Sequence, residues 1–354
     1  MKKLAFLIAT LGAAAGASAQ SSVTLSGIVD NSLTYGSGSL SSRSSLANSA
    51  NSTSRLIFRG VEDLGGGMSA QFWLEAGLGT DTGQGMATNI NNQPTGTGAA
   101  VAGTQGITFN RRSTLGLAGD WGELRLGRDY TPQYSSNAKY DPYSNLGVGA
   151  SQISISSIAG PTQVRASNSV AYHTSPKLGA LYATAMYYMG ENNSGAATSS
   201  DGNGGGVRVL YDTGGFSASA AVARTKFAAG DITSTNLGGD YTWNDIRFMV
   251  FGQRDKVGNA IGLTGKGVQV GVVGNVGVGQ IKGSWSQYKT TAVGSPKSTK
   301  LAVGYVYNFS KRAAVYGTYA HLKNDGGATQ SLAGSTTAPN GSSNGFDLGL
   351  RFAF

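Results

Sequence analysis

The chain has 354 residues, no cysteine and a formal net charge of +9. Its 55 glycines exclude a mainly helical fold, because glycine costs about 1 kcal/mol at each helical site. The absence of cysteine excludes a small disulfide-stabilised scaffold. The sequence pI is 9.6, yet the basic residues are dispersed without a basic helix or a Lys/Arg run, so nucleic acid is not an expected partner.

The first residues carry the pattern of a targeting signal. Lys2 and Lys3 precede a short apolar stretch at residues 4–15, and residues 17–19 read Ala-Ser-Ala. A positive start, a short apolar core and a small-x-small site predict a cleaved signal peptide over residues 1–19. The mature chain, residues 20–354, is then exported as one domain, and cleavage lowers the formal charge by two.

The rest of the chain alternates apolar and polar residues in stretches of about ten. Mean hydropathy is −0.13, and charged or polar residues interrupt every long apolar window. A period of two predicts strands with one apolar and one polar face. The clearest apolar sets are Val23, Leu25, Val29, Leu33 and Tyr35; Ala70, Phe72, Leu74 and Ala76; Ile246, Phe248 and Val250; and Leu301, Val303, Tyr305 and Tyr307.

Short and long connectors alternate along the chain. Short turns rich in Gly, Asp and Asn occur at 63–67, 119–123, 175–179, 212–215, 243–245, 274–277 and 310–312. Long polar connectors occur at 36–53, 78–106, 129–163, 190–206, 229–234, 257–263, 290–297 and 324–344. Short turns on one rim and long loops on the other are typical of outer-membrane barrels. The pattern predicts an all-β fold, an antiparallel transmembrane barrel of about sixteen strands.

The carboxy-terminal strand supports this prediction. Phe346, Leu348, Leu350, Phe352 and Phe354 alternate with small or polar residues up to the last position. A soluble sheet rarely leaves a flat aromatic edge of this kind, because such an edge invites aggregation. An even number of strands places both ends of the chain on the short-turn rim.

Four segments together resemble the Gram-negative general porins, particularly the trimeric porins of β-proteobacteria. They are VTLSG at 23–27, SRLIFRGVEDLGGG at 54–67, LGLAGDWG at 115–122 followed by LGR at 126–128, and the terminal Phe354. The resemblance covers the whole chain. It implies a sixteen-stranded barrel, a homotrimer and a third long loop that folds inward to narrow the pore, and it implies that Phe354 acts as an assembly signal.

The resemblance also implies where the pore narrows. The family's constriction arginines match Arg55, in the Arg-Leu-x-Phe segment, Arg128, in Leu-Gly-Arg, and Arg165. Arg59 shares the parity of Arg55 and therefore its face of the strand. Arg128 shares the parity of the apolar Leu124 and Leu126, so it needs a bulge or a strand end to turn inward. The alternative is that these arginines are ordinary solvated lumen charges.

The third long connector supplies the expected acidic side of the constriction. Asp129 and Asp141 are its only carboxylates, and Asp141 is the stronger candidate. The acidic and Gly-Gly motif frequent in this loop of the family is absent from the chain. The alternative is that Asp141 is a solvated loop charge.

Catalytic and metal-binding patterns are not found. The two histidines, His173 and His321, lie far apart and lack an accompanying nucleophile or metal-ligand spacing. No enzyme activity, cofactor or metal is expected. Two other classes remain open: an outer-membrane barrel enzyme, and a secreted adhesin-like β-protein.

The expected function is passive diffusion of small hydrophilic solutes and ions, with a moderate preference for anions. The expected location is the outer membrane of a Gram-negative cell. The expected partners are two further copies of the chain, membrane lipids and lipopolysaccharide, and the permeating solutes.

Overall fold

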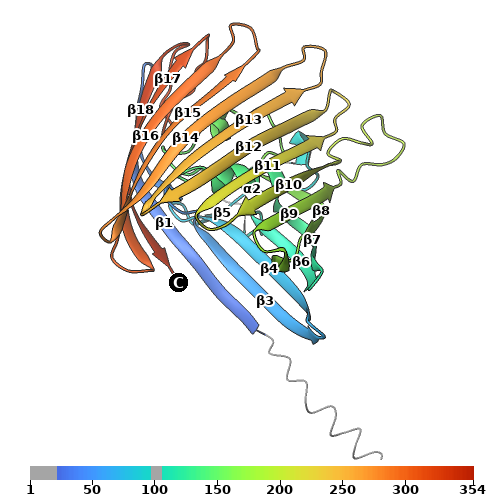
Figure 1. Ribbon diagram of the computed structural model, residues 1–354. Helices are drawn as coiled ribbons and strands as arrows, with labels where there is room; N and C mark the ends of the chain where they lie inside the picture. The colour runs from blue at the N-terminus through green and yellow to red at the C-terminus, as the bar shows by residue number, and fades with distance from the viewer. Residues whose placement is uncertain (1–21, 97–105) are drawn as a thin grey trace, which may run out of the picture.

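The computed structural model describes residues 22–96 and 106–354. Within them the chain forms one antiparallel sheet that closes on itself (Figure 1). The predicted signal peptide, residues 1–19, lies outside the described residues and stays a prediction. None of the described helices is long and apolar enough to cross a membrane.

The strands have the following bounds: β1 Ser22–Gly38, β2 Ser42–Asn48, β3 Arg55–Gly65, β4 Met68–Gly79, β5 Gln84–Gly85, β6 Arg112–Gly119, β7 Gly122–Tyr130, β8 Arg165–His173, β9 Leu181–Tyr188, β10 Gly204–Asp212, β11 Phe216–Thr225, β12 Ile232–Trp243, β13 Ile246–Val257, β14 Thr264–Val276, β15 Gly279–Thr290, β16 Lys297–Asn308, β17 Ala313–Asp325 and β18 Ser342–Ala353. The helices are η1 Pro94–Gly96, α2 Pro132–Lys139, α3 Gln152–Ser156 and η2 Pro176–Leu178.

These segments make sixteen barrel strands, as predicted. β2 and β3 are two parts of one barrel strand, since both pair with β1. They are separated by an excursion at residues 49–54. The long connector predicted at 36–53 is therefore wrong, because β1 continues to Gly38, β2 pairs with it over Ser42–Asn48, and only residues 39–41 connect the two. β5 is a two-residue extension within the second long loop and pairs only with the end of β4.

The barrel closes between the first and last strands. β1 pairs with β18 over eleven residue pairs, from Ile28↔Ala353 to Gly38↔Ser343. Gly27 and Phe354 then exchange two backbone hydrogen bonds of 3.0 Å each. A side chain at Gly27 would collide with the Phe354 ring, since an added Cβ would lie 2.5 Å from it. Because glycine has no side chain, Gly27 leaves room for the ring of Phe354.

The predicted alternation gives an apolar outer face and a polar inner face. On β16, the outward Leu301 and Val303 are 60% and 55% exposed, whereas the inward Ala302 is 2% exposed. Inward positions on other strands are held by Ser, Asn, Gln and Thr, which pack against loops inside the barrel. An apolar outer surface around a closed sheet is typical of a barrel that crosses the outer membrane.

The loop between β7 and β8, residues 131–164, folds into the barrel and is called L3 below. Figure 1 shows α2, which belongs to L3, inside the ring of strands. Two apolar clusters attach L3 to the wall: Tyr140 and Ile153 pack with Phe251 and Tyr288, and Tyr143 and Val148 pack with Ala302, Ala320, Leu322 and Leu332. The inward third loop is confirmed.

Glycines on the wall make this close packing possible. An added Cβ at Gly238 would lie 2.4 Å from the Tyr140 ring, and one at Gly271 would lie 2.3 Å from Pro142. Both glycines are on inward positions of their strands, so any larger residue would push L3 away from the wall. Helix α2 contacts β9 to β12, and α3 contacts β14 to β16, so L3 rests on one side of the lumen.

The terminal aromatic residue generates a first prediction. Phe354→Ala keeps both backbone hydrogen bonds to Gly27 and removes only a ring that is 47% exposed, which is worth at most about 1.5–3 kcal/mol of burial. We expect refolding yield in detergent to change little, but the yield of folded barrel in cells to fall several-fold. Phe352→Ala, an outward aromatic with 49% exposure, is the matched control. Equal losses in cells for both variants would show that Phe354 acts only through stability.

Candidate functional site

A cavity of about 520 Å³ separates L3 from the wall formed by β3, β7 and β8. Three arginines, Arg55, Arg111 and Arg165, line its wall side together with Tyr130. Residues of L3, among them Tyr134, Ser144, Asn145 and Leu146, line the other side. No carboxylate is among the lining residues of this cavity.

Tyr130 and the main chain hold the arginines in place. The Tyr130 hydroxyl accepts hydrogen bonds from Nη2 of Arg111 at 2.7 Å and from Nη2 of Arg165 at 2.8 Å. The Arg165 guanidinium lies 4.4 Å from the centre of the Tyr130 ring, and its Nε donates to the Arg111 carbonyl at 2.8 Å. The Tyr130 ring stacks on Tyr134 of L3 at 5.0 Å. Arg165 forms no ion pair within residues 22–96 and 106–354, so its positive charge remains available to a permeating ion.

One carboxylate, that of Glu75, lies close to Arg55 and Arg111. Glu75 Oε1 is 2.6 Å from Nε of Arg111 and 3.7 Å from Nε of Arg55. Glu75 is on β4, directly opposite Arg112 of β6. The Arg55 side chain is 26% exposed and that of Arg111 is 11% exposed. Arg55 is therefore the cation of this pair that is more accessible to a solute.

A second basic group continues along the same wall. The guanidinium groups of Arg59 and Arg112 lie 5.3 Å and 4.6 Å from the Trp73 ring. Arg125 pairs with Glu123 at 2.7 Å and with Asp129 at 2.6 Å, and Arg112 lies 3.5 Å from Asp129. Arginines outnumber carboxylates on this side of the barrel.

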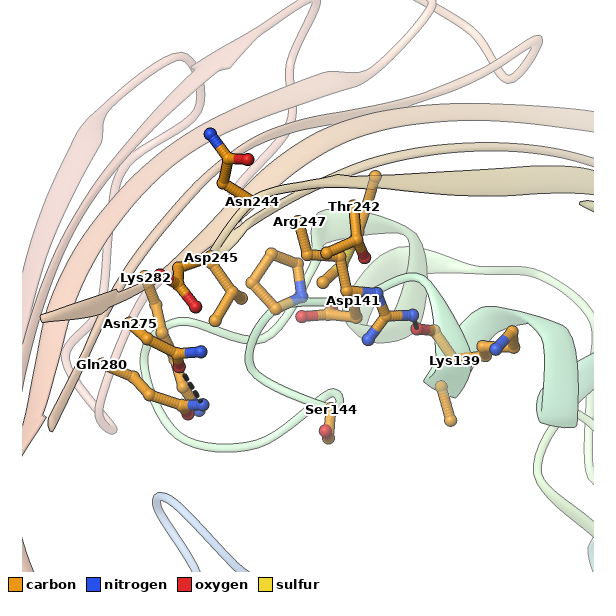
Figure 2. A pocket seen from close by; sticks show the side chains of 14 residues that line it. Lys139, Asp141, Ser144, Thr242, Asn244, Asp245, Arg247, Asn275, Gln280 and Lys282 are labelled. Carbon is orange, nitrogen blue, oxygen red and sulfur yellow. Dashed lines mark hydrogen bonds between the residues drawn. The ribbon is translucent and has the colours of Figure 1, made fainter. Parts of the chain in front are cut away.

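L3 borders a second cavity, of about 560 Å³, on the side of β12 to β15 (Figure 2). Its charged lining residues are Lys139, Asp141, Asp245, Arg247 and Lys282. Lys139 pairs with Asp212 at 2.8 Å, and Arg247 pairs with Asp240. Ala138 and Ser144 line both cavities, so the two cavities meet at the same part of L3.

Asp141 lies within L3 and does not extend into open water. Its carboxylate accepts hydrogen bonds from the backbone N–H of Tyr143 at 2.7 Å and of Ser151 at 2.9 Å, and it is 3% exposed. Burial raises the pKa of the Asp141 carboxyl, although the two N–H groups and the charge of Lys300 act in the opposite direction. These contacts fix the turn of L3, and Figure 2 shows Asp141 set back beside Lys139 and Arg247.

The arginine predicted from Leu-Gly-Arg has a different environment from the others. Nε of Arg128 donates to the Asn110 carbonyl at 2.6 Å, and Nη1 donates to the Asn89 carbonyl at 3.1 Å and to Ser167 Oγ at 2.8 Å. A register shift does occur beside it, between Gly127 and Asp129. The Arg128 guanidinium is thus bound to the second long loop and does not line the cavity of Arg55.

Comparisons with known proteins agree with this architecture. A family model described as Gram-negative porin matches residues 4–327. The chain belongs to the Gram-negative porins. Outer membrane porin protein 32 of Delftia acidovorans is 35% identical over the full length of both chains. An outer membrane porin protein of Bordetella pertussis is 26% identical over 92% of this chain and 95% of the relative.

Solved structures show the same relationship. An anion-selective porin from Comamonas acidovorans superposes with a TM-score of 0.83 at 34% identity, covering 95% of this porin and 100% of that chain. OmpT of Vibrio cholerae, at 15% identity and a TM-score of 0.67 over 94% of this chain and 99% of that one, shares the fold. This porin is therefore a protein of the Gram-negative outer membrane.

The predicted constriction residues of this porin do not all lie together. The structure brings Arg55 and Arg165 together at one cavity and places Arg59 on the same wall beside Trp73. It adds Arg111, Arg112 and Arg125, which the sequence analysis did not single out. Two adjacent arginines at the end of a long loop could have indicated these positions in the sequence, because β6 begins at Arg112 and Arg111 directly precedes it. Asp129, predicted for the acidic side, lies on the basic wall between Arg112 and Arg125.

The histidines do not form a site. His173 Nδ1 lies 2.6 Å from the Tyr182 hydroxyl, and His321 Nδ1 lies 2.9 Å from Asn344 Oδ1 on the outer face. No group of His, Asp or Glu suited to a metal ion occurs in residues 22–96 and 106–354.

The contacts of Asp141 generate a second prediction. Asp141→Ala leaves the N–H groups of Tyr143 and Ser151 buried without an acceptor, which costs about 1–3 kcal/mol for each group. We expect L3 to loosen, so that single-channel current becomes noisier and a protease cleaves L3 faster. Asp245→Ala is the matched control, because it removes the same charge from the lining of the same cavity. The structural role of Asp141 would be contradicted by equal current noise and equal cleavage rates in the two variants.

Proposed function

We propose that this porin is a general diffusion channel for small hydrophilic solutes with a moderate preference for anions. The observation that carries the proposal is the convergence of Arg55, Arg111 and Arg165 on one cavity beside L3, with Glu75 as the nearest carboxylate. Rings of Arg and Lys are the usual device of anion-conducting pores. The anion-selective porin of Comamonas acidovorans, 34% identical to this chain, supports the same conclusion.

The expected selectivity follows from the charges. Two unit charges 4 Å apart interact by about 1 kcal/mol in bulk water and by about 4 kcal/mol at an effective dielectric of about 20. A wet constriction lies between these limits, and salt screens charges beyond about 8 Å at physiological ionic strength. A small excess of positive charge therefore biases permeation by about 1–2 kcal/mol, and about 1.4 kcal/mol is a factor of ten. The channel prefers anions without excluding cations.

The individual residues have different roles in this proposal. Arg55 and Arg165 form the basic side of the constriction with Arg111, and Arg59 lines the approach to it. Arg128 supports the second long loop from behind the cavity. Asp129 compensates Arg112 and Arg125, and Asp141 holds the shape of L3. The acidic side of the constriction is therefore weak, because both of the predicted carboxylates are engaged in other contacts.

The proposal includes the absence of enzyme activity. Support comes from the porin family itself. The described pair closest to hydrolase geometry is His173 with its hydroxyl neighbours, since His173 Nδ1 lies 2.6 Å from the Tyr182 hydroxyl and 3.1 Å from Thr184 Oγ1. Hydrolysis of ester or peptide substrates by the purified channel, above that of a His173→Ala preparation, would contradict this part.

The proposal also includes assembly as a homotrimer embedded in outer-membrane lipids. It rests on the resemblance to trimeric porins and on the hollow interior, since a barrel of this size is not filled by its own side chains. We expect an unheated detergent gel to show a species of about three times the monomer mass, which collapses to the monomer on heating. A lone monomer after gentle extraction would contradict the trimer.

Selectivity is tested by neutralising one arginine. Arg55→Gln removes a cavity charge that is more exposed than Arg111, and we expect the anion-to-cation permeability ratio to fall about three- to fivefold, from a loss of about 0.7–1 kcal/mol. The measurement is the reversal potential in a KCl gradient across a planar bilayer of neutral lipid. Lys323→Gln, at an exposed outward position of β17, is the matched control and should leave the reversal potential unchanged. Cation preference of the unmodified channel, or equal shifts in the two variants, would overturn the proposal.

A further inference from the structure

The outer face of β13 to β16 carries a row of basic residues near the long loops. Its members, called the basic row below, are Arg254 on β13, Lys266 on β14, Lys289 on β15 and Lys297 on β16. Each occupies an outward position of its strand. Arg254, Lys266 and Lys289 are exposed, and the Lys297 side chain is 35% exposed.

The register of the sheet places these residues directly beside one another. Arg254 is the partner of Lys266, Lys266 is the partner of Lys289, and Lys289 is the partner of Lys297. The Cβ atoms of directly opposite residues lie about 4.5–5.5 Å apart, and like charges at such positions destabilise a sheet. Four consecutive strands therefore repeat an arrangement that costs the fold stability.

Nothing in the described part of the chain offsets this repulsion along most of the row. Lys297 pairs with Asp325 at 3.2 Å, whereas Arg254, Lys266 and Lys289 have no ion pair within residues 22–96 and 106–354. A nearby outward arginine shows the contrast, since Arg224 on β11 pairs with Asp231. The basic row therefore presents its charge to something outside the chain.

The position of the row indicates what that partner is. Apolar residues continue directly below it on the same face: Val268 and Val270 on β14 are each 49% exposed, and Leu301 on β16 is 60% exposed. Alternate residues on a strand are about 6–7 Å apart, so the row lies at the upper edge of the surface that meets the hydrocarbon. In an outer-membrane barrel the long loops face the cell exterior, which puts the row at the headgroup level of the outer leaflet.

We propose that the basic row is a binding site for the phosphate groups of lipopolysaccharide in the outer leaflet. Arg and Lys form charge-assisted hydrogen bonds with phosphate oxygens, and a phosphate bridging two neighbouring strands turns their repulsion into attraction. A second copy of the chain is a poor occupant, because its own basic row would add to the repulsion. The proposal rests on the outer-membrane location and is independent of the permeation pathway.

The test measures binding of lipid A to the folded channel in detergent. Lys266→Gln/Lys289→Gln removes the two central charges and keeps most of the length of both side chains. We expect its affinity for bisphosphorylated lipid A, measured by native mass spectrometry, to fall at least tenfold. The matched control is Lys311→Gln/Arg312→Gln, which removes two exposed charges from the short turn between β16 and β17 and should bind as the unmodified channel does. Equal affinity of the two double variants would overturn the proposal.

Two further arms use the unmodified channel and need no variant. Dephosphorylated lipid A should bind at least tenfold more weakly than the bisphosphorylated form, and equal binding would overturn the role of phosphate. Inorganic phosphate at millimolar concentration should fail to displace lipid A, because it lacks the acyl chains that contact Val268 and Leu301. Displacement by inorganic phosphate would identify a site for free phosphate and overturn the lipid assignment.

A last measurement separates this proposal from the one on selectivity. The reversal potential of Lys266→Gln/Lys289→Gln in neutral lipid should match that of the unmodified channel.

Discussion

The structure depends on the closure of its sheet between β1 and β18. A bilayer interior offers no partner for a backbone N–H or C=O group, so an open sheet edge in lipid would cost several kcal/mol for each unpaired group. The register from Ile28↔Ala353 to Gly38↔Ser343 removes that edge, and the two hydrogen bonds between Gly27 and Phe354 extend the closure to the last residue. Because the wall must be apolar outside, its alternate residues are polar inside, and the hollow interior follows from the same constraint.

The hollow interior then determines where L3 and the charges lie. L3 packs on strands between β13 and β17 through Tyr140, Ile153, Tyr143 and Val148. Some of its backbone N–H groups donate to carboxylates, as Val148 N–H does to Asp347 at 2.7 Å. The acidic residues on this side are thus used to hold L3. The arginines on β3 to β8 keep a surplus of positive charge across the remaining cavity, and this asymmetry is the basis of the proposed anion preference.

The sequence predicted those features that follow from strict periodicity. Parity placed Arg55 and Arg59 on the inner face, and the alternation of short and long connectors predicted the sixteen strands. Arg111 was missed because it precedes β6, where the chain is irregular and parity gives no direction. Asp141 has a charge typical of a pore lining, but its two backbone hydrogen bonds depend on the fold of L3. The break between β2 and β3 depends on contacts of Asp30 with Ser52 and Tyr316, which join segments distant in sequence.

In the proposed permeation pathway, L3 stays packed against the strands between β13 and β17 while ions pass along Arg55, Arg111 and Arg165. Ser136 of α2 and Ser219 of β11 are buried, with their Oγ atoms 2.9 Å apart, and the chain has no cysteine of its own. In the double variant Ser136→Cys/Ser219→Cys, a disulfide should form and lock L3 to the wall. We expect the oxidised channel to have the same conductance and the same reversal potential as the reduced channel. Loss of anion preference on oxidation, or failure of the disulfide to form, would contradict this pathway.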